Sequence, residues 1–223
     1  MRLFKQFMAS LLAVVILIGA APMRTQAASV SKISVDYIYT DQVDIKVETS
    51  GSGTLQSYEY RVKYNNKVVK SGTSKVLRRQ SGGSDRFCRA SIPTNSAVQV
   101  SVRAKIGGSW TPWSGYIWVV PKVTNARCVT YTNKNVRLSW TKVKGVTDYA
   151  VYVTTKPSGT WKKVKNTKGR SITIRTYDGK NVFKTGKTYY VKVLARKQSG
   201  SGYVKSKGYN KSWYMFKFKF TRK

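Results

Sequence analysis

The side chains through which this chain could act are lysine, arginine, tyrosine and tryptophan, which bind ligands but do not form a catalytic set. The sequence contains no histidine, so the side chain that most often serves as a base near neutral pH is absent. Its 8 acidic residues are scattered without paired spacing, and the two in the second half, Asp148 and Asp178, fall in predicted turns. We therefore expect a protein that is not an enzyme, with no catalytic residue, no cofactor and no metal site.

Positive charge is the strongest signal in the composition, and it is concentrated in the second half of the chain. The sequence has 42 Lys and Arg against 8 Asp and Glu, a formal net charge of +34. Residues 28–121 contain 13 basic and 6 acidic residues, whereas residues 122–223 contain 26 basic and 2 acidic residues, a net charge of +24. Such a charge attracts polyanions, so we expect an anionic partner such as teichoic acid, extracellular nucleic acid or acidic glycan. Solubility alone is the alternative explanation.

Strand alternation in the second half places basic and aromatic side chains together on one outward face. Lysine and arginine neutralise anionic groups there, while tyrosine rings can stack on bases or sugars. The alternative is an ordinary solvated face with its tyrosines lying flat on the sheet. Arg137 and Arg175 are expected on the other sheet, so positive charge is not confined to one side. The candidate polyanion-binding residues are Lys162, Lys163, Lys165, Lys192, Arg196, Lys205, Lys207, Tyr152 and Tyr190.

The elements that position these side chains are predicted to be strands, because apolar and polar residues alternate with a period of two. The clearest runs lie between residues 135 and 195, and residues 43–104 show the same order of runs. Such a repeat indicates two similar modules in tandem. We place the first module at residues 28–121 and the second at residues 122–213, joined by a short linker that limits their relative freedom.

Residues 1–27 have the pattern of a secretory signal peptide. Arg2 and Lys5 precede an apolar run over residues 8–20, and small residues lead to a predicted cleavage site after Ala27. The run is too short for a comfortable membrane span. We expect an exported protein without a stable transmembrane span, secreted or held at the cell surface by contacts. A retained N-terminal anchor is the alternative.

Two aromatic positions give the second module a recognisable signature. Trp140 ends one alternating run, and Tyr189 opens the run Tyr-Tyr-Val-Lys-Val-Leu-Ala. These positions resemble the fibronectin type III family and its bacterial members, in which a tryptophan on the second strand packs across the core and a tyrosine opens the sixth strand. The first module departs from this pattern, with Val47 and Val98 at the corresponding positions. The resemblance implies an all-β fold of two tandem immunoglobulin-like (fibronectin type III) β-sandwiches after the signal peptide.

The first module has its own aromatic motif, Trp110-Thr-Pro-Trp113-Ser, just after its predicted sixth strand. It resembles the Trp-Ser-x-Trp-Ser motif of cytokine-receptor modules of this fold, whose tryptophans interleave with arginines. Strand parity puts Arg61 and Arg103 on the outward face beside it. We predict a structural cation–π ladder of Arg61, Trp113, Arg103 and Trp110, in which each contact contributes about 0.5–2 kcal/mol. The alternative is that the tryptophans simply cover the edge of the core.

Cys88 and Cys128 are the only two cysteines, one in each predicted module. Cys88 shares strand parity with Ala90 and Ile92, which is typical of a small buried apolar side chain. We expect two free thiols, with a bridge between the two halves as the alternative in an exported chain.

Residues 214–223 form an amphipathic, basic C-terminal tail with phenylalanines at alternate positions from Phe216 to Phe220. We expect it to pack within the chain as a strand, either extending the last sheet or crossing to the first module. The alternative is an exposed strand that pairs with another chain or inserts at a membrane surface.

These features together favour a non-catalytic, exported binding or adhesion protein that associates with anionic polymers or surfaces through its second module. Two alternatives stay open: a carbohydrate- or protein-recognition module driven by Trp and Tyr, and a structural spacer with no single ligand. Added salt distinguishes the first two, because it screens charge neutralisation far more than ring stacking.

Overall fold

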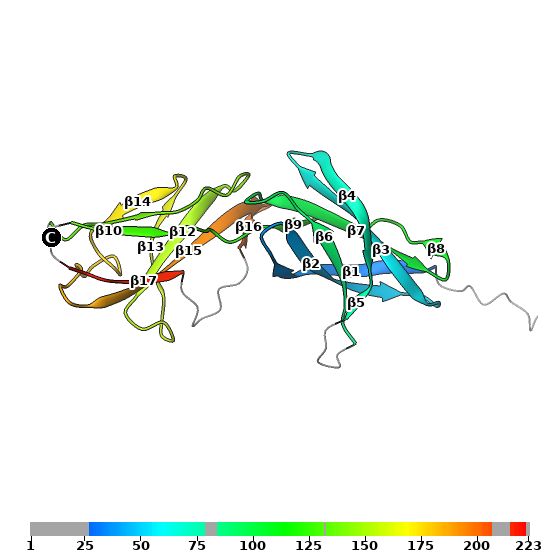
Figure 1. The fold of residues 1–223 in the computed structure, drawn as a ribbon, viewed down its shortest axis with the longest axis horizontal. Coiled ribbons are helices and arrows are strands. Elements are labelled where there is room, and N and C mark those ends of the chain that lie inside the picture. Colours follow the sequence, from blue (N-terminus) through cyan, green and yellow to red (C-terminus); the bar gives the residue numbers. More distant parts are fainter. Residues whose placement is uncertain (1–26, 79–83, 132, 207–214, 222–223) are drawn as a thin grey trace, which may run out of the picture.

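A computed structural model describes residues 27–78, 84–131, 133–206 and 215–221 (Figure 1). Every regular element in these residues is a β-strand, as the alternation of apolar and polar residues predicts. No helix in the described part is long and apolar enough to cross a membrane. The predicted signal peptide lies almost entirely outside the described residues.

The first half forms a sandwich of two antiparallel sheets. One sheet has the order β1-β2-β6-β5, and the other has the order β4-β3-β7, with β8 and β9 both pairing with the outer edge of β7. The strands are β1 (Ser29–Ile38), β2 (Gln42–Ser50), β3 (Leu55–Tyr64), β4 (Lys67–Lys75), β5 (Leu77–Arg78), β6 (Arg86–Ser91), β7 (Val98–Ile106), β8 (Ser109–Trp110) and β9 (Ile117–Val119).

The second half repeats this architecture. One sheet has the order β10-β11-β14, and the other has the order β13-β12-β15, with β16 and β17 both pairing with the outer edge of β15. The strands are β10 (Arg127–Thr130), β11 (Val136–Ser139), β12 (Asp148–Thr154), β13 (Lys162–Thr167), β14 (Ser171–Ile174), β15 (Thr188–Ser199), β16 (Gly202–Lys205) and β17 (Phe216–Lys219). Both halves are therefore fibronectin type III-like sandwiches, with the two sheets of an immunoglobulin-like fold.

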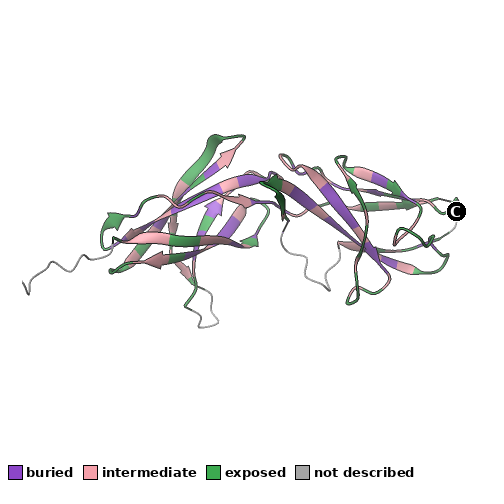
Figure 2. Cartoon of the chain, turned by 180° about the vertical axis from the view of Figure 1, so that it is seen from behind, coloured by how far each residue is buried: buried purple, intermediate pink, exposed green. Residues whose placement is uncertain are grey.

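Each sandwich has its own core of inward side chains, which appear as alternating buried positions along the strands (Figure 2). Trp140 packs across the second core and meets the ring of Tyr149 edge-on, with 5.3 Å between the ring centroids. Tyr189 is fully buried, and its hydroxyl accepts a hydrogen bond of 2.9 Å from the backbone N–H of Lys184. Such a bond ties the start of the sixth strand to the chain just before it. Val98 occupies the equivalent place in the first sandwich and packs without a polar anchor.

Cys88 and Cys128 lie in different sandwiches and are free thiols. Burial raises the pKa of each thiol to about 12, so both remain protonated near neutral pH. Because the thiolate is the reactive form, these cysteines are expected to behave as small apolar side chains.

The described part of the predicted C-terminal tail, residues 215–221, belongs to the second sandwich. Its residues 216–219 form β17, which pairs antiparallel with Thr188–Val191 of β15. Phe220 is 1% exposed and stacks on Phe183, with 5.7 Å between the ring centroids. The strand extends the sheet of its own module and does not cross to the first one.

We expect Phe220→Ala to destabilise the chain by about 3–5 kcal/mol, because it removes a buried ring and leaves a cavity in the core. The measurement is the urea midpoint of unfolding, with the exposed neighbour Lys219→Ala as the control. A shift no larger than that of the control would show that the segment contributes nothing to the core.

The two sandwiches are joined end to end by backbone pairing as well as by the linker (Figure 1). The N–H of Ala97 donates to the carbonyl of Lys144 at 2.8 Å, and the N–H of Lys144 donates to the carbonyl of Asn95 at 2.7 Å. Ala97, together with the linker residues Val120 and Val123, packs into the core of the second sandwich. The short linker and these contacts limit the freedom of the joint.

Gly145 allows the chain to pass through this joint. Its φ is +75°, and a Cβ at this position would lie 3.1 Å from the ring of Tyr64 and 3.2 Å from the carbonyl oxygen of Ala97. The joint thus needs both the backbone conformation and the missing side chain of glycine.

We expect Gly145→Ala to cost about 1–3 kcal/mol from its backbone strain alone, with a further cost from the contact at the joint. Gly179→Ala is the matched control, because Gly179 also has a positive φ (+87°) but open space around its Cβ position. Chemical unfolding and limited proteolysis at the linker should both separate the variants. Equal effects of the two substitutions would mean that the joint tolerates a side chain.

Candidate anion-binding surface

The candidate binding residues lie around the sheet β13-β12-β15-β16, but that sheet uses several of them internally. Tyr152 is paired with Lys163 on one side and with Lys192 on the other. Cross-strand partners point to the same side of a sheet, so these three side chains form one outward row. In this row Lys163 is exposed, Tyr152 is half-buried and Lys192 is buried.

The prediction that strand parity exposes Lys192 is wrong, since its side chain is 6% exposed. Trp161, which precedes β13, covers it, with the ammonium nitrogen 4.2 Å from the ring centroid. The indole is held in turn by a hydrogen bond of 3.1 Å from its Nε1 to the carbonyl of Pro157. Burial under the ring lowers the pKa of Lys192. This lysine therefore supports the sheet and is not available to a polymer.

Arg196 is also buried, which corrects its expected exposure. Its Nε and Nη2 atoms donate to the two carboxylate oxygens of Asp148 at 2.7 and 2.5 Å, a bidentate ion pair. The guanidinium lies 4.3 Å from the ring centroid of Tyr203. Hydrogen bonding to Asp148 raises the pKa of Arg196.

The remaining lysines of the set are exposed but do not share one face. In β13, Lys162 is paired with Val153 and, because of a bulge after Lys163, Lys165 is paired with Val151, whereas Lys163 is paired with Tyr152. The first two therefore lie on the opposite side of this edge strand from Lys163. Lys205 is exposed opposite Arg196, Tyr190 is half-buried, and Lys207 lies outside the described residues.

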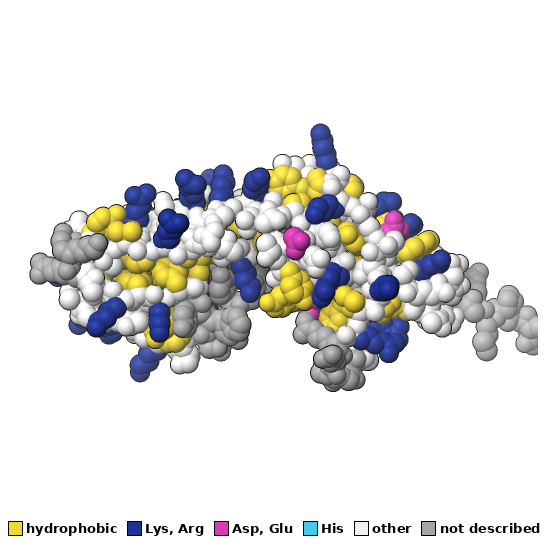
Figure 3. Space-filling model, in the orientation of Figure 1, with side chains coloured by type: hydrophobic (Ala, Val, Ile, Leu, Met, Phe, Trp, Pro, Cys, Tyr) yellow, Lys and Arg dark blue, Asp and Glu magenta, His cyan; other side chains and the backbone are white. Residues whose placement is uncertain are grey.

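The carboxylates of the second sandwich are both engaged in local contacts. Asp148 is paired with Arg196, and Asp178 accepts hydrogen bonds from the backbone N–H groups of Asn181 (2.7 Å) and Lys180 (3.0 Å). These bonds hold the pKa of Asp178 below its ordinary value, the backbone bond from Asn181 most of all. In the view of Figure 3, the second sandwich, at the left, shows Lys and Arg side chains and no described carboxylate.

The other sheet of this sandwich holds a basic hollow that the sequence indicated only through Arg137. Its volume is about 550 Å³, and three arginines and one lysine line it together with small polar residues. We call this feature the arginine groove; its lining residues are Asn125, Arg127, Arg137, Ser139, Trp140, Thr141, Lys142, Arg170 and Ser171.

The first sandwich contains the predicted cation–π ladder on the outer face of β3 and β7. The guanidinium carbon of Arg61 lies 4.1 Å from the ring centroid of Trp113, and that of Arg103 lies 4.8 Å from Trp113 and 4.9 Å from Trp110. Sequence reasoning missed Glu59, which accepts a hydrogen bond of 2.6 Å from Nε of Arg103. Strand parity alone could have found it, because it lies two residues before Arg61 on the same face.

The Trp110-Thr-Pro-Trp113-Ser segment also lies along β7 where a continuous last strand would otherwise pair. Between β8 and β9, the side chain of Thr111 accepts from the N–H of Ala104 at 3.0 Å, and the side chain of Ser114 accepts from the N–H of Val102 at 3.0 Å. Side-chain hydroxyls thus take the place of backbone carbonyls along β7. The motif accordingly has a structural explanation.

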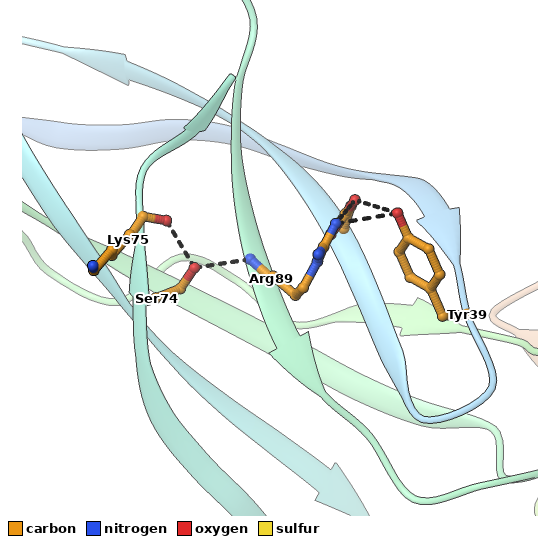
Figure 4. A network of polar contacts seen from close by, with 5 residues as sticks. Tyr39, Ser74, Lys75 and Arg89 are labelled. Carbon is orange, nitrogen blue, oxygen red and sulfur yellow. Dashed lines mark hydrogen bonds and ion pairs between the residues drawn. The ribbon is translucent and has the colours of Figure 1, made fainter. Parts of the chain in front are cut away.

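A second cluster of polar and aromatic groups lies at the other face of the first sandwich (Figure 4). Arg89 donates to both carboxylate oxygens of Asp44, at 2.7 and 2.9 Å, and to the hydroxyl of Tyr39 at 3.1 Å. The rings of Tyr37 and Tyr39 are 4.7 Å apart and both exposed. Hollows of about 330 and 320 Å³ adjoin this tyrosine pair. Within the described residues, no three His, Cys, Asp or Glu side chains are grouped as a metal ion would require.

We expect Asp148→Asn to destabilise the chain by about 3–5 kcal/mol, because it leaves the buried guanidinium of Arg196 without its counter-charge. Asp178→Asn makes the same change of net charge in a turn where the amide oxygen can still accept hydrogen bonds, so it should cost much less. The urea midpoints of the two variants compare them directly. Equal shifts would mean that net charge, rather than this ion pair, sets the stability.

Comparison with known proteins gives structural similarity only. No protein-family model matches the chain, and no curated protein matches it. A two-domain fibronectin type III segment from chicken tenascin is similar to it, with 14% sequence identity, a TM-score of 0.38 and coverage of 79% of this chain and 93% of that one. A chain of a cytokine receptor complex is similar with 13% identity, a TM-score of 0.45 and coverage of 75% and 85%. The fold follows from the strand order described above, and neither similarity bears on a ligand.

Proposed function

We propose that this chain is a non-catalytic, exported binding protein that associates with anionic polymers or surfaces through its second sandwich. The supporting observation is that both carboxylates of that sandwich already have partners within it. Asp148 neutralises a buried arginine, and Asp178 is bonded within its own turn. Among the described residues of this sandwich, the exposed lysines and arginines form no ion pair with a carboxylate, so an external polyanion can neutralise them.

The mechanism is multivalent charge neutralisation with release of counterions. Lys205 and the cations of the arginine groove belong to different sheets, which suits a flexible polymer that wraps the module better than a small rigid ligand. We therefore propose that the chain binds a range of anionic ligands, with high affinity only at low or moderate salt. Export is supported by the signal-peptide pattern of residues 1–27.

We expect the full chain to bind labelled heparin with an affinity that falls linearly on a log–log plot against salt, with a slope of about −2 to −4 for three to six neutralised anionic groups. Fluorescence anisotropy measures this, with labelled dextran as the neutral polymer. Binding to dextran that survives about 0.5 M salt, where charges are screened beyond about 4 Å, would contradict the proposal. Absence of binding to either polymer would favour a spacer.

A second candidate function is recognition of a neutral glycan by the exposed pair Tyr37 and Tyr39. Two tilted rings beside a hollow provide apolar faces for a sugar ring, and Asp44 and Arg89 hold Tyr39 in place. In the same assay, Tyr37→Ala with Tyr39→Ala should abolish dextran binding if this pair is the site, and leave heparin binding unchanged.

A further inference from the structure

We propose that the arginine groove of the second sandwich is a specific site for tetrahedral oxyanions, phosphate or sulfate groups carried in series on a flexible polymer. This inference rests on the proposed function and deepens it by naming the site and the chemistry of the ligand. It moves the main site from the sheet that the sequence favoured to the opposite sheet, β10-β11-β14.

Strand register builds the groove. Arg127 of β10 is paired with Ser139 of β11, and Ser139 is paired in turn with Ser171 of β14. The exposed Arg137 lies two positions before Ser139 on the same face of β11. Small serines thus form the middle of the row and long cationic side chains stand around them, which produces the hollow of about 550 Å³. Diagonal neighbours such as Arg127 and Arg137 start about 7–8 Å apart, within reach of one polymer segment.

Backbone hydrogen bonds fix the rim of the groove. The N–H of Trp140 donates to the carbonyl of Arg170 at 3.0 Å, which holds the start of β14 against the end of β11. The N–H of Thr141 donates to the carbonyl of Thr124 at 2.9 Å, and the amide of Asn125 donates to the hydroxyl of Thr141 at 3.2 Å. The segments that carry the cations are therefore ordered before any ligand binds, which reduces the entropic cost of binding.

The charge of the groove is not compensated from within. No carboxylate lines it. Among the described residues, the side chains of Arg127, Arg137, Lys142 and Arg170 form no ion pair. This contrasts with Arg196 on the other sheet, which is already bound to a carboxylate. Four like charges around one hollow attract an oxyanion strongly, because each raises the potential at the same place.

The residue types indicate which anion fits. Three of the four cations are arginines, whose planar fork of donors binds phosphate, sulfate or carboxylate oxygens in pairs. The hydroxyls of Ser139 and Ser171 add short donors at the middle of the groove, suited to the further oxygens of a tetrahedral group. Trp140 is the single aromatic residue of the lining and is 4% exposed, so the groove has no stacking platform for bases. We therefore expect recognition of the charged groups themselves.

The test compares two triple variants of the full chain that remove the same charge from the same sandwich. The groove variant, Arg127→Gln, Arg137→Gln and Arg170→Gln, removes three positive charges from the groove. The β13 variant, Lys162→Gln, Lys163→Gln and Lys165→Gln, removes three exposed positive charges from that edge strand. Binding is measured with heparin, inorganic polyphosphate and polyglutamate, which present sulfate, phosphate and carboxylate groups respectively. Unfolding midpoints check that both variants fold.

We expect the groove variant to lose affinity for heparin and polyphosphate by about tenfold or more, with its log–log salt slope smaller by about 2, while the β13 variant loses less than about threefold. A third variant, Arg127→Lys, Arg137→Lys and Arg170→Lys, keeps the charge and should keep the slope but bind more weakly, because lysine lacks the fork. Polyglutamate should bind more weakly than either oxyanion polymer and be less sensitive to the loss of the groove arginines.

Equal losses in the two glutamine variants would overturn the groove as a site while leaving polyanion binding by the sandwich intact. The same holds if the lysine variant binds as tightly as the unmodified chain, since net charge would then suffice. Failure of the unmodified chain to bind any of the three polymers would overturn the proposed function itself. Loss of affinity for heparin alone, or for polyphosphate alone, would identify which source of oxyanion the groove accepts.

Discussion

The ion pair between Asp148 and Arg196 is the constraint on which the charge distribution of the second sandwich depends. The half of the chain that contains this module has 26 basic residues and only 2 acidic ones. A carboxylate that pairs with one cation therefore cannot neutralise another. The fold uses Asp148 to hold a guanidinium that is nearly buried on the face of the sheet. A buried arginine without this partner would be far more costly than an exposed one. Apart from Lys192, which Trp161 covers, the other described lysines and arginines of this sandwich are exposed or half-buried.

In each sandwich, alternating cationic and aromatic side chains cover the outer face of the corresponding sheet. In the first, Arg61, Trp113, Arg103 and Trp110 interleave across β3 and β7. In the second, Trp161 covers Lys192 and Tyr203 lies beside Arg196, across β12 and β15 and their edge strands. Stacked cations and rings therefore protect this sheet in each module. In the described part of the second sandwich, the arginines of the opposite sheet are not stacked on rings and instead surround a hollow.

Alternation of apolar residues was sufficient to predict the strands, the repeat and the identity of the core aromatics, because side chains in a strand point to opposite faces in turn. Trp140 and Tyr189 are buried as the resemblance implied. Parity correctly indicated that Lys192 and Arg196 point outward from the core, but it could not show that Trp161 and Asp148, distant in sequence, would cover them. The bulge that moves Lys165 to the opposite side from Lys163 likewise arises from the pairing of two strands. The groove was not predicted because its residues come from three strands and the segments beside them, whose relative positions are fixed only by the folded sheet.

The joint between the sandwiches gives the molecule a mechanical character. The two sandwiches follow one another along the long axis (Figure 1), so tension applied along that axis runs through the contact of Ala97 with Lys144. Two backbone hydrogen bonds, a few apolar side chains and the stacking of Lys197 on Trp118 are among the contacts that resist bending there, whereas each sandwich is braced by a complete core. We therefore expect bending to occur at the joint before it occurs within either sandwich. If the second sandwich binds a surface, the contacts at the joint would restrict the orientation of the first sandwich relative to that surface. A flexible linker alone would not do so.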